Sequence, residues 1–124
     1  MSGWRVAALA GVLAAAACGS EGPISGPGTL TAALVSPNGA EGAALVEFFG
    51  QGIGAVSAVD GPLWQRSRGD TVRVFIVSET GGTLRFAVEV ADTTRKPKGV
   101  VLEVSDPADE VRASLSGYAL EFRR

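Results

Sequence analysis

Few side chains in this sequence could carry out chemistry, and Cys18 supplies its single thiol. Histidine is absent. Its absence excludes Ser–His and Cys–His nucleophilic pairs, imidazole base catalysis and the usual zinc and copper ligand sets. The remaining enzyme chemistry would need paired carboxylates with separated pKa values, or a Ser–Lys pair. Because the acidic residues fall in expected turns or on the outward phase of expected strands, we expect neither an enzyme nor a cofactor.

Cys18 follows an apolar segment that begins after a single charge, Arg5. The apolar segment covers residues 6–17. It is therefore about a dozen residues long, short of the roughly 20 that a bilayer-spanning helix needs. A positive start, a short apolar run and small residues before a junction are typical of an export signal. We therefore expect residues 1–17 to form a signal peptide that is no part of the folded domain.

The junction Leu13-Ala14-Ala15-Ala16-Ala17-Cys18 resembles the lipobox of bacterial lipoproteins. In that family the cysteine thiol is acylated and the cysteine becomes the mature N terminus. The resemblance implies an extracytoplasmic protein anchored to a membrane through lipid on Cys18. It implies the outer membrane in a Gram-negative bacterium, because no Asp follows the cysteine.

The same junction also permits ordinary signal cleavage. Ala15 stands where a lipobox usually has leucine, and Ala15-x-Ala17 satisfies the small-x-small rule. The alternative is a periplasmic or secreted protein with a free thiol at Cys18.

The sequence after the junction divides into a tether and one domain. Residues 18–28 are rich in Gly, Pro and Ser, which predicts a flexible linker. Residues 29–124 suffice for a single domain with a core that needs no disulfide. Without Arg5 the chain holds ten basic and thirteen acidic residues, and this mild acidity argues against a nucleic-acid partner.

Apolar residues recur with a period near two from Thr29 onward, which is the pattern of β-strands. The expected strands cover residues 29–34, 43–49, 53–59, 63–68, 72–76, 84–90, 100–104 and 118–122. Short strands with frequent turn signals predict an all-β fold, either a single antiparallel sandwich of Ig-like or Greek-key type or a partly open barrel. The stretch Leu115–Leu120, with Tyr118 at the start of a strand, resembles the tyrosine corner of immunoglobulin-like and fibronectin-type sandwiches.

The strands at 72–76 and 84–90 are expected to pair as a hairpin. A three-residue loop, either Glu79-Thr80-Gly81 or Thr80-Gly81-Gly82, would place both apolar sets on one face. In these registers Arg73 lies opposite or diagonal to Glu89, as a solvated cross-strand pair.

Asp106, Asp109 and Glu110 are candidate calcium ligands, because calcium prefers clustered carboxylates. Their spacing does not match the twelve-residue calcium loop. The favoured interpretation is a helical turn, with Asp106 as its N-cap and Pro107 at its first position.

Trp64, Arg66 and Arg68 form a candidate binding surface, since a tryptophan beside arginines can stack on a sugar or anchor a protein. The interpretation that the sequence favours is different: Trp64 closes one end of the sandwich while the arginines extend into solvent. The only dense basic segment, Arg95-Lys96-Pro97-Lys98, is expected to be a solvated loop.

These observations favour a cell-envelope lipoprotein with a non-enzymatic binding or assembly domain, whose partner is an envelope protein or a glycan. One alternative is a structural or accessory subunit of an envelope complex that pairs through an exposed edge strand. A third is a glycan-binding module or a carboxylate-based enzyme.

Overall fold

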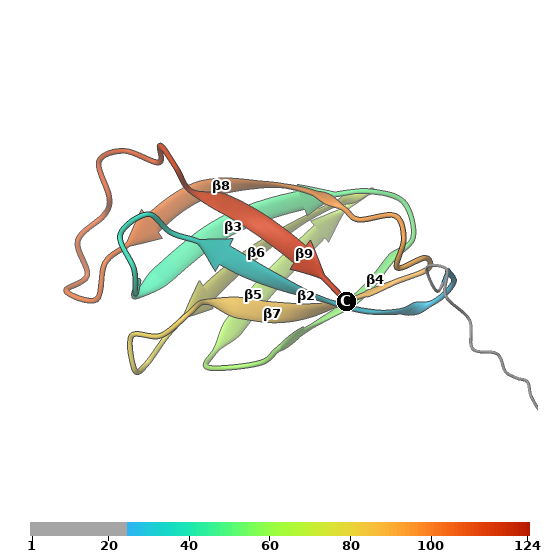
Figure 1. The fold of residues 1–124 in the computed structure, drawn as a ribbon, viewed down its shortest axis with the longest axis horizontal. Helices are drawn as coiled ribbons and strands as arrows, with labels where there is room; N and C mark the ends of the chain where they lie inside the picture. Colours follow the sequence, from blue (N-terminus) through green and yellow to red (C-terminus); the bar gives the residue numbers. More distant parts are fainter. Residues whose placement is uncertain (1–24) are drawn as a thin grey trace, which may run out of the picture.

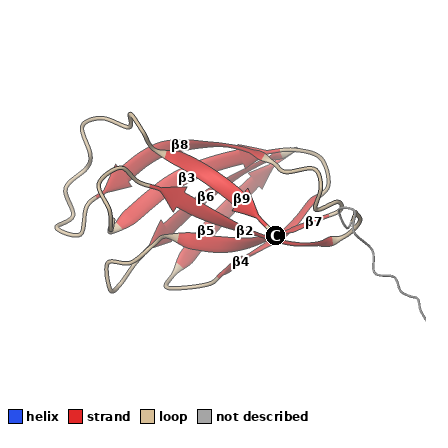
Figure 2. Ribbon diagram, in the orientation of Figure 1, coloured by secondary structure: helices blue, strands red, loops and turns tan. Residues whose placement is uncertain are grey.

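The structure is a computed structural model that describes residues 25–124. The expected signal peptide, Cys18 and most of the expected tether lie outside the described residues. Figure 2 shows that the regular elements of the described chain are all strands. Across residues 25–124 there is no helix long and apolar enough to cross a membrane.

The described chain forms eight strands, each within two residues of a predicted one at either end. They are β2 (Gly28–Val35), β3 (Ala43–Phe49), β4 (Ile53–Ala58), β5 (Leu63–Arg68), β6 (Thr71–Val77), β7 (Arg85–Val90), β8 (Lys98–Ser105) and β9 (Ala119–Arg123). Strand β2 begins at Gly28, so the last residue assigned to the tether belongs to the sheet.

The strands form two four-stranded antiparallel sheets that pack face to face (Figure 1). The first sheet has the strand order β4-β7-β2-β9, and the second sheet has the order β5-β6-β3-β8. The two sheets are not closed into a barrel. The predicted all-β sandwich is confirmed.

The predicted hairpin between β6 and β7 is wrong, because the two strands lie in different sheets. Strand β6 pairs with β3 and β5, whereas β7 pairs with β2 and β4. Residues 78–84 carry the chain from one sheet to the other. Both strands still point their apolar residues into the same core, so a period-two pattern cannot distinguish strands that pair from strands that face one another. As a result Arg73 lies opposite Glu47, not Glu89.

The core lies between the sheets and has an aromatic centre. Phe48 of the second sheet is fully buried, and its ring centroid lies 5.7 Å from that of Phe86 and 5.5 Å from that of Phe122. Phe86 and Phe122 belong to the first sheet. The three rings therefore join the two sheets, in the tilted and edge-to-face arrangements that aromatic pairs prefer.

The two open sides of the sandwich are held by different contacts. On one side, the Gln65 side-chain amide of β5 donates a hydrogen bond of 3.1 Å to the Val56 carbonyl of β4. On the other side, β8 approaches β9 so closely that a Cβ at Gly99 would lie 2.8 Å from a methyl carbon of Leu120. That close approach explains a glycine within a strand.

The loops gather at two opposite ends of the sandwich (Figure 1). The end where the described chain begins, here called the entry end, holds the C-terminus and loops 50–52, 69–70 and 91–97. The opposite end, here called the far end, holds loops 36–42, 59–62, 78–84 and 106–118.

Replacing Phe48 with alanine should lower the free energy of unfolding by about 3–5 kcal/mol, because it removes a buried ring and leaves a cavity. Phe49→Ala should cost no more than about 1 kcal/mol, because the Phe49 side chain is turned outward on the opposite phase of β3. Urea denaturation of the two variants measures both changes. Similar losses at the two positions would contradict the inward placement of Phe48.

Candidate binding surface

Trp64 lies on the outer face of the second sheet and is 57% exposed. The interpretation that it closes one end of the sandwich is therefore wrong. Strand β5 is an edge strand, and its inward phase is occupied by Leu63 and Gln65. A period-two strand that turns Leu63 inward must turn Trp64 outward.

The tryptophan belongs to an apolar row that crosses three strands. Trp64 lies opposite Phe75 of β6, and Phe75 lies opposite Leu45 of β3. The Trp64 and Phe75 ring centroids are 5.7 Å apart and their planes meet at 35°. Phe75 is itself 40% exposed. The row therefore presents a rigid aromatic pair to solvent.

A charged row runs beside the aromatic pair. Arg66 of β5 lies opposite Arg73 of β6, which lies opposite Glu47 of β3. Arg73 donates hydrogen bonds from Nε and Nη2 to Oε2 of Glu47, at 3.1 and 2.8 Å. Like charges directly opposite one another are unfavourable, and within residues 25–124 Arg66 takes part in no ion pair. The row therefore carries an excess of positive charge.

Together the two rows line a shallow, open depression of about 650 Å³. Its lining includes all three residues of the candidate binding surface predicted from the sequence: Trp64, Arg66 and Arg68. Sequence reasoning did not find Phe75 and Arg73, because the pairing of β5 with β6 brings them to the same place.

The outer face of the first sheet has a different character. Thr29, Thr31 and Ala33 of β2 alternate with its buried residues. The aromatic residues of this sheet's strands, Phe86 and Phe122, are both buried. The aromatic and cationic surface therefore belongs to one face of the sandwich.

The candidate calcium ligands are not assembled into a metal site. No group of three His, Cys, Asp or Glu side chains between residues 25 and 124 is placed to hold a metal ion. Residues 106–110 form a turn, so the predicted helical turn is also wrong. Asp106 Oδ1 accepts hydrogen bonds from the backbone N–H groups of Ala108 and Glu110, and Asp109 adopts a left-handed φ of 67°, which a helix cannot continue.

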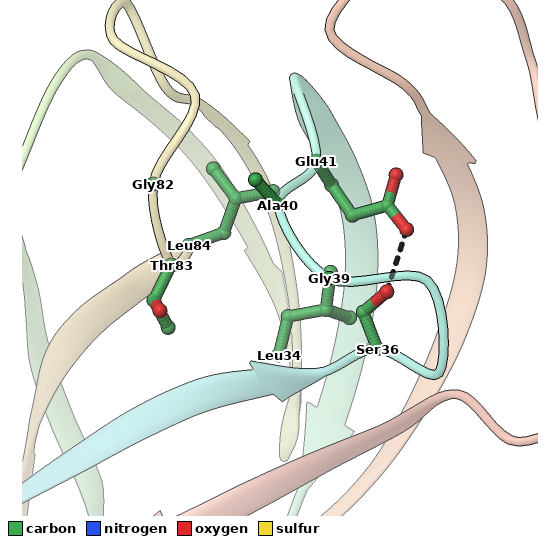
Figure 3. A pocket seen from close by; sticks show the side chains of 8 residues that line it. All are labelled: Leu34, Ser36, Gly39, Ala40, Glu41, Gly82, Thr83 and Leu84. Atoms are coloured by element: carbon green, nitrogen blue, oxygen red, sulfur yellow. Dashed lines mark hydrogen bonds between the residues drawn. The ribbon is translucent and has the colours of Figure 1, made fainter.

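The sequence interpretation missed a buried carboxylate at the far end. Glu41, in the loop between β2 and β3, is only 1% exposed. Its Oε1 accepts hydrogen bonds from Nε and Nη2 of Arg112, at 3.1 and 3.0 Å. Its Oε2 accepts hydrogen bonds from the hydroxyls of Ser36, at 2.6 Å, and Tyr118. Figure 3 shows the Glu41 carboxylate pointing toward Ser36.

These partners decide the ionisation of Glu41. Burial alone would raise the pKa of Glu41, but the hydrogen bonds from Ser36, Tyr118 and Arg112, with the charge of Arg112, hold that pKa below its ordinary value of 4.5. Both carboxylate oxygens are already engaged by two donors each. Glu41 is also the only titratable residue that lines the adjacent depression of about 360 Å³ (Figure 3). We therefore assign this cluster a structural role.

The cluster also accounts for Tyr118. Its hydroxyl reaches back to the loop between β2 and β3, where it donates to Glu41 and accepts a hydrogen bond of 2.8 Å from the Asn38 amide. Tyr118 therefore fastens the turn before β9 to the β2–β3 loop through side chains.

Comparison with protein-family models, with curated proteins and with solved structures gives no significant match.

The lowered pKa of Glu41 predicts acid sensitivity. Because the folded chain binds this proton at lower pH than the unfolded chain does, the stabilisation is complete above about pH 4.5 and is lost as the pH falls through the folded pKa. Glu41→Gln should cost about 1–3 kcal/mol at neutral pH, and the difference from the wild type should shrink in acid. Urea denaturation across pH measures both profiles. A difference that stays constant with pH would contradict the assignment.

Proposed function

We propose that this protein is a membrane-anchored, extracytoplasmic lipoprotein whose β-sandwich is a non-enzymatic binding module. The binding surface is the outer face of the second sheet around Trp64, and the ligand is an envelope protein or a glycan. The observation that carries the proposal is the exposed Trp64 ring, supported by Phe75 and flanked by arginines.

An exposed tryptophan on a rigid sheet is well suited to binding. A large ring that is already held in place by Phe75 loses little conformational freedom when a partner covers it. Tryptophan and arginine are also the residue types that most often dominate binding energy at interfaces. The exposed Trp64 ring suits stacking on a sugar, and Arg66 adds a hydrogen-bond donor with no carboxylate partner in the described chain.

The acidic residues support a role other than catalysis. A carboxylate enzyme needs one carboxyl group whose pKa is raised in an apolar pocket. The buried carboxylate in the described chain, Glu41, has the opposite shift, because its neighbours stabilise the charged form.

Pairing through an edge strand is less well supported than binding through the sheet face. Strand β8 carries a bulge opposite Leu45 and Val46, and the register of β4 is irregular between Ile53 and Val56. The edge strand β5 places Arg66 and Arg68 among its outward residues. Bulges and charges are the devices that discourage an additional strand from pairing.

The membrane anchor rests on the sequence. The apolar segment 6–17 and the lipobox-like junction support acylation of Cys18, which precedes the domain. Two or more acyl chains attach a protein stably, at about 0.8 kcal/mol for each buried methylene.

Truncation of the tryptophan should abolish binding and leave the fold intact. We expect Trp64→Ala, in the full chain, to reduce capture of the ligand from native envelopes by about tenfold or more. Val35→Ala is the matched control, since Val35 is 40% exposed on the first sheet. Crosslinking and pull-down measure capture, and mass spectrometry of the N-terminal peptide in the same run should find acyl groups on Cys18.

Each outcome bears on a separate part of the proposal. Unchanged capture by a folded Trp64→Ala variant would contradict the binding surface. If that variant fails to fold, Arg66→Glu replaces it, and unchanged capture by Arg66→Glu contradicts the surface equally. An unmodified Cys18 would overturn the anchor and leave the binding surface to be judged by the capture data.

A further inference from the structure

Within residues 25–124 the charges are segregated between the two ends of the sandwich. The entry end gathers six cationic side chains, Arg68, Arg95, Lys96, Lys98, Arg123 and Arg124, against the four carboxylates Asp70, Glu89, Asp92 and Glu121, of which Glu121 is paired with Arg123. The far end has the reverse balance, with the carboxylates Glu41, Asp60, Glu79, Asp106, Asp109 and Glu110 against Arg85 and Arg112. A chain that is mildly acidic overall therefore has one basic end.

Four cations of the entry end are available to an external partner, whereas Arg123 forms an ion pair with Glu121. Arg95, Lys96 and Lys98 are exposed, as is Arg68. By contrast, both arginines of the far end form ion pairs, Arg85 with Asp60 and Arg112 with Glu41.

The carboxylate beside the basic loop, Asp92, interacts electrostatically with Arg95 but forms no ion pair with the loop, so it offsets only part of the loop's positive charge. Asp92 Oδ1 accepts hydrogen bonds from the backbone and hydroxyl of Thr94, at 3.0 and 2.7 Å, and from the backbone N–H of Gly26. That oxygen is therefore directed toward Thr94 and Gly26.

An exposed aromatic ring also lies at the entry end. Phe49, at the end of β3, is 45% exposed and lies between Lys98 of β8 and Thr71 of β6. Thr71 in turn lies opposite Arg68 of β5. An aromatic side chain between basic residues is the combination that settles at the boundary between lipid headgroups and acyl chains.

The N-terminal segment joins the domain at this basic end. Gly26 is fixed to the loop after β7, because its carbonyl accepts a hydrogen bond of 3.0 Å from the N–H of Thr93. Seven residues, 19–25, separate this point from Cys18. A chain of that length spans at most about 25 Å.

We propose that the entry end of the sandwich docks on an anionic phospholipid surface, with Lys96, Lys98 and Arg68 against the headgroups and Phe49 at the boundary. The site shares Arg68 with the edge of the depression around Trp64, but its other residues lie outside that depression. The proposal rests on the proposed function only for bringing the domain to a membrane. Each basic residue near an anionic bilayer strengthens binding by about fivefold. Trp64 lies four residues along β5 from Arg68, a distance of about 13 Å along the strand. The Trp64 ring therefore stays exposed when the entry end is docked.

The lysine content of the chain provides a direct readout of docking. Lys96 and Lys98 are its only lysines, so acylation of side-chain amines reports on the docking rim alone. The full chain, purified from bacterial membranes, is reconstituted into phosphatidylcholine vesicles with or without phosphatidylglycerol. An uncharged amine-acylating reagent is applied, and mass spectrometry follows the labelling rate at both lysines.

We expect labelling to be about threefold slower or more on the anionic vesicles, and the difference to disappear at high salt. The double variant Arg68→Glu/Arg124→Glu should remove the protection. Arg85→Glu, a charge reversal at the far end, should retain it, and so should Trp64→Ala. Equal labelling on both vesicle types would overturn the proposal, as would loss of protection in Arg85→Glu.

The test separates docking from the proposed function. If the chain is recovered in soluble form, the same vesicles are added to it, and equal labelling then overturns docking. Lost ligand capture by Trp64→Ala, together with retained lysine protection, would support both sites as independent surfaces.

Discussion

The packing of Phe48 against Phe86 and Phe122 joins the two sheets, and the positions of the surface residues follow from it. Because side chains alternate along a strand, an inward Phe48 requires Glu47 and Phe49 to point outward. Because paired residues point to the same face, strand pairing then fixes which side chains of the neighbouring strands also point outward. Glu47 meets Arg73, and Phe49 meets Lys98. The core contact therefore determines which residues form the candidate binding surface and which lie at the basic entry end.

The strands could be predicted from the sequence, but their partners could not. A period of two reports that one phase of a strand is buried, and it located all eight strands closely. It does not report whether two strands pair in one sheet or face one another across the core. For this reason β6 and β7 were expected to form a hairpin, and Arg73 was matched with Glu89 instead of Glu47.

The candidate site was predicted in part for a related reason. Trp64, Arg66 and Arg68 were recognised by residue type, but a large aromatic ring was expected to be buried. Only the pairing of β5 with β6 reveals that Trp64 lies opposite the outward Phe75, on the face exposed to solvent. Glu41 was missed because its partners Tyr118 and Arg112 are more than 70 residues away in sequence. No local sequence pattern predicts a contact between residues so far apart in the chain.

Three groups of residues lie in different parts of the sandwich. The far end is fastened by the Glu41 cluster, in which every hydrogen bond to the carboxylate is made within the chain. The entry end gathers cations where the N-terminal segment arrives. The aromatic row of the second sheet lies on the outer face between these two ends, and Arg68 at the edge of its depression also belongs to the entry end.

Site-specific photo-crosslinking in intact cells tests the binding face most directly. A photoreactive residue is placed in the full chain in place of Arg66, on the outer face of the second sheet, and separately in place of Thr31, on the outer face of the first sheet. We predict a discrete adduct from position 66 and none from position 31. The absence of an adduct at position 66, or equal adducts from both positions, would contradict a binding surface around Trp64.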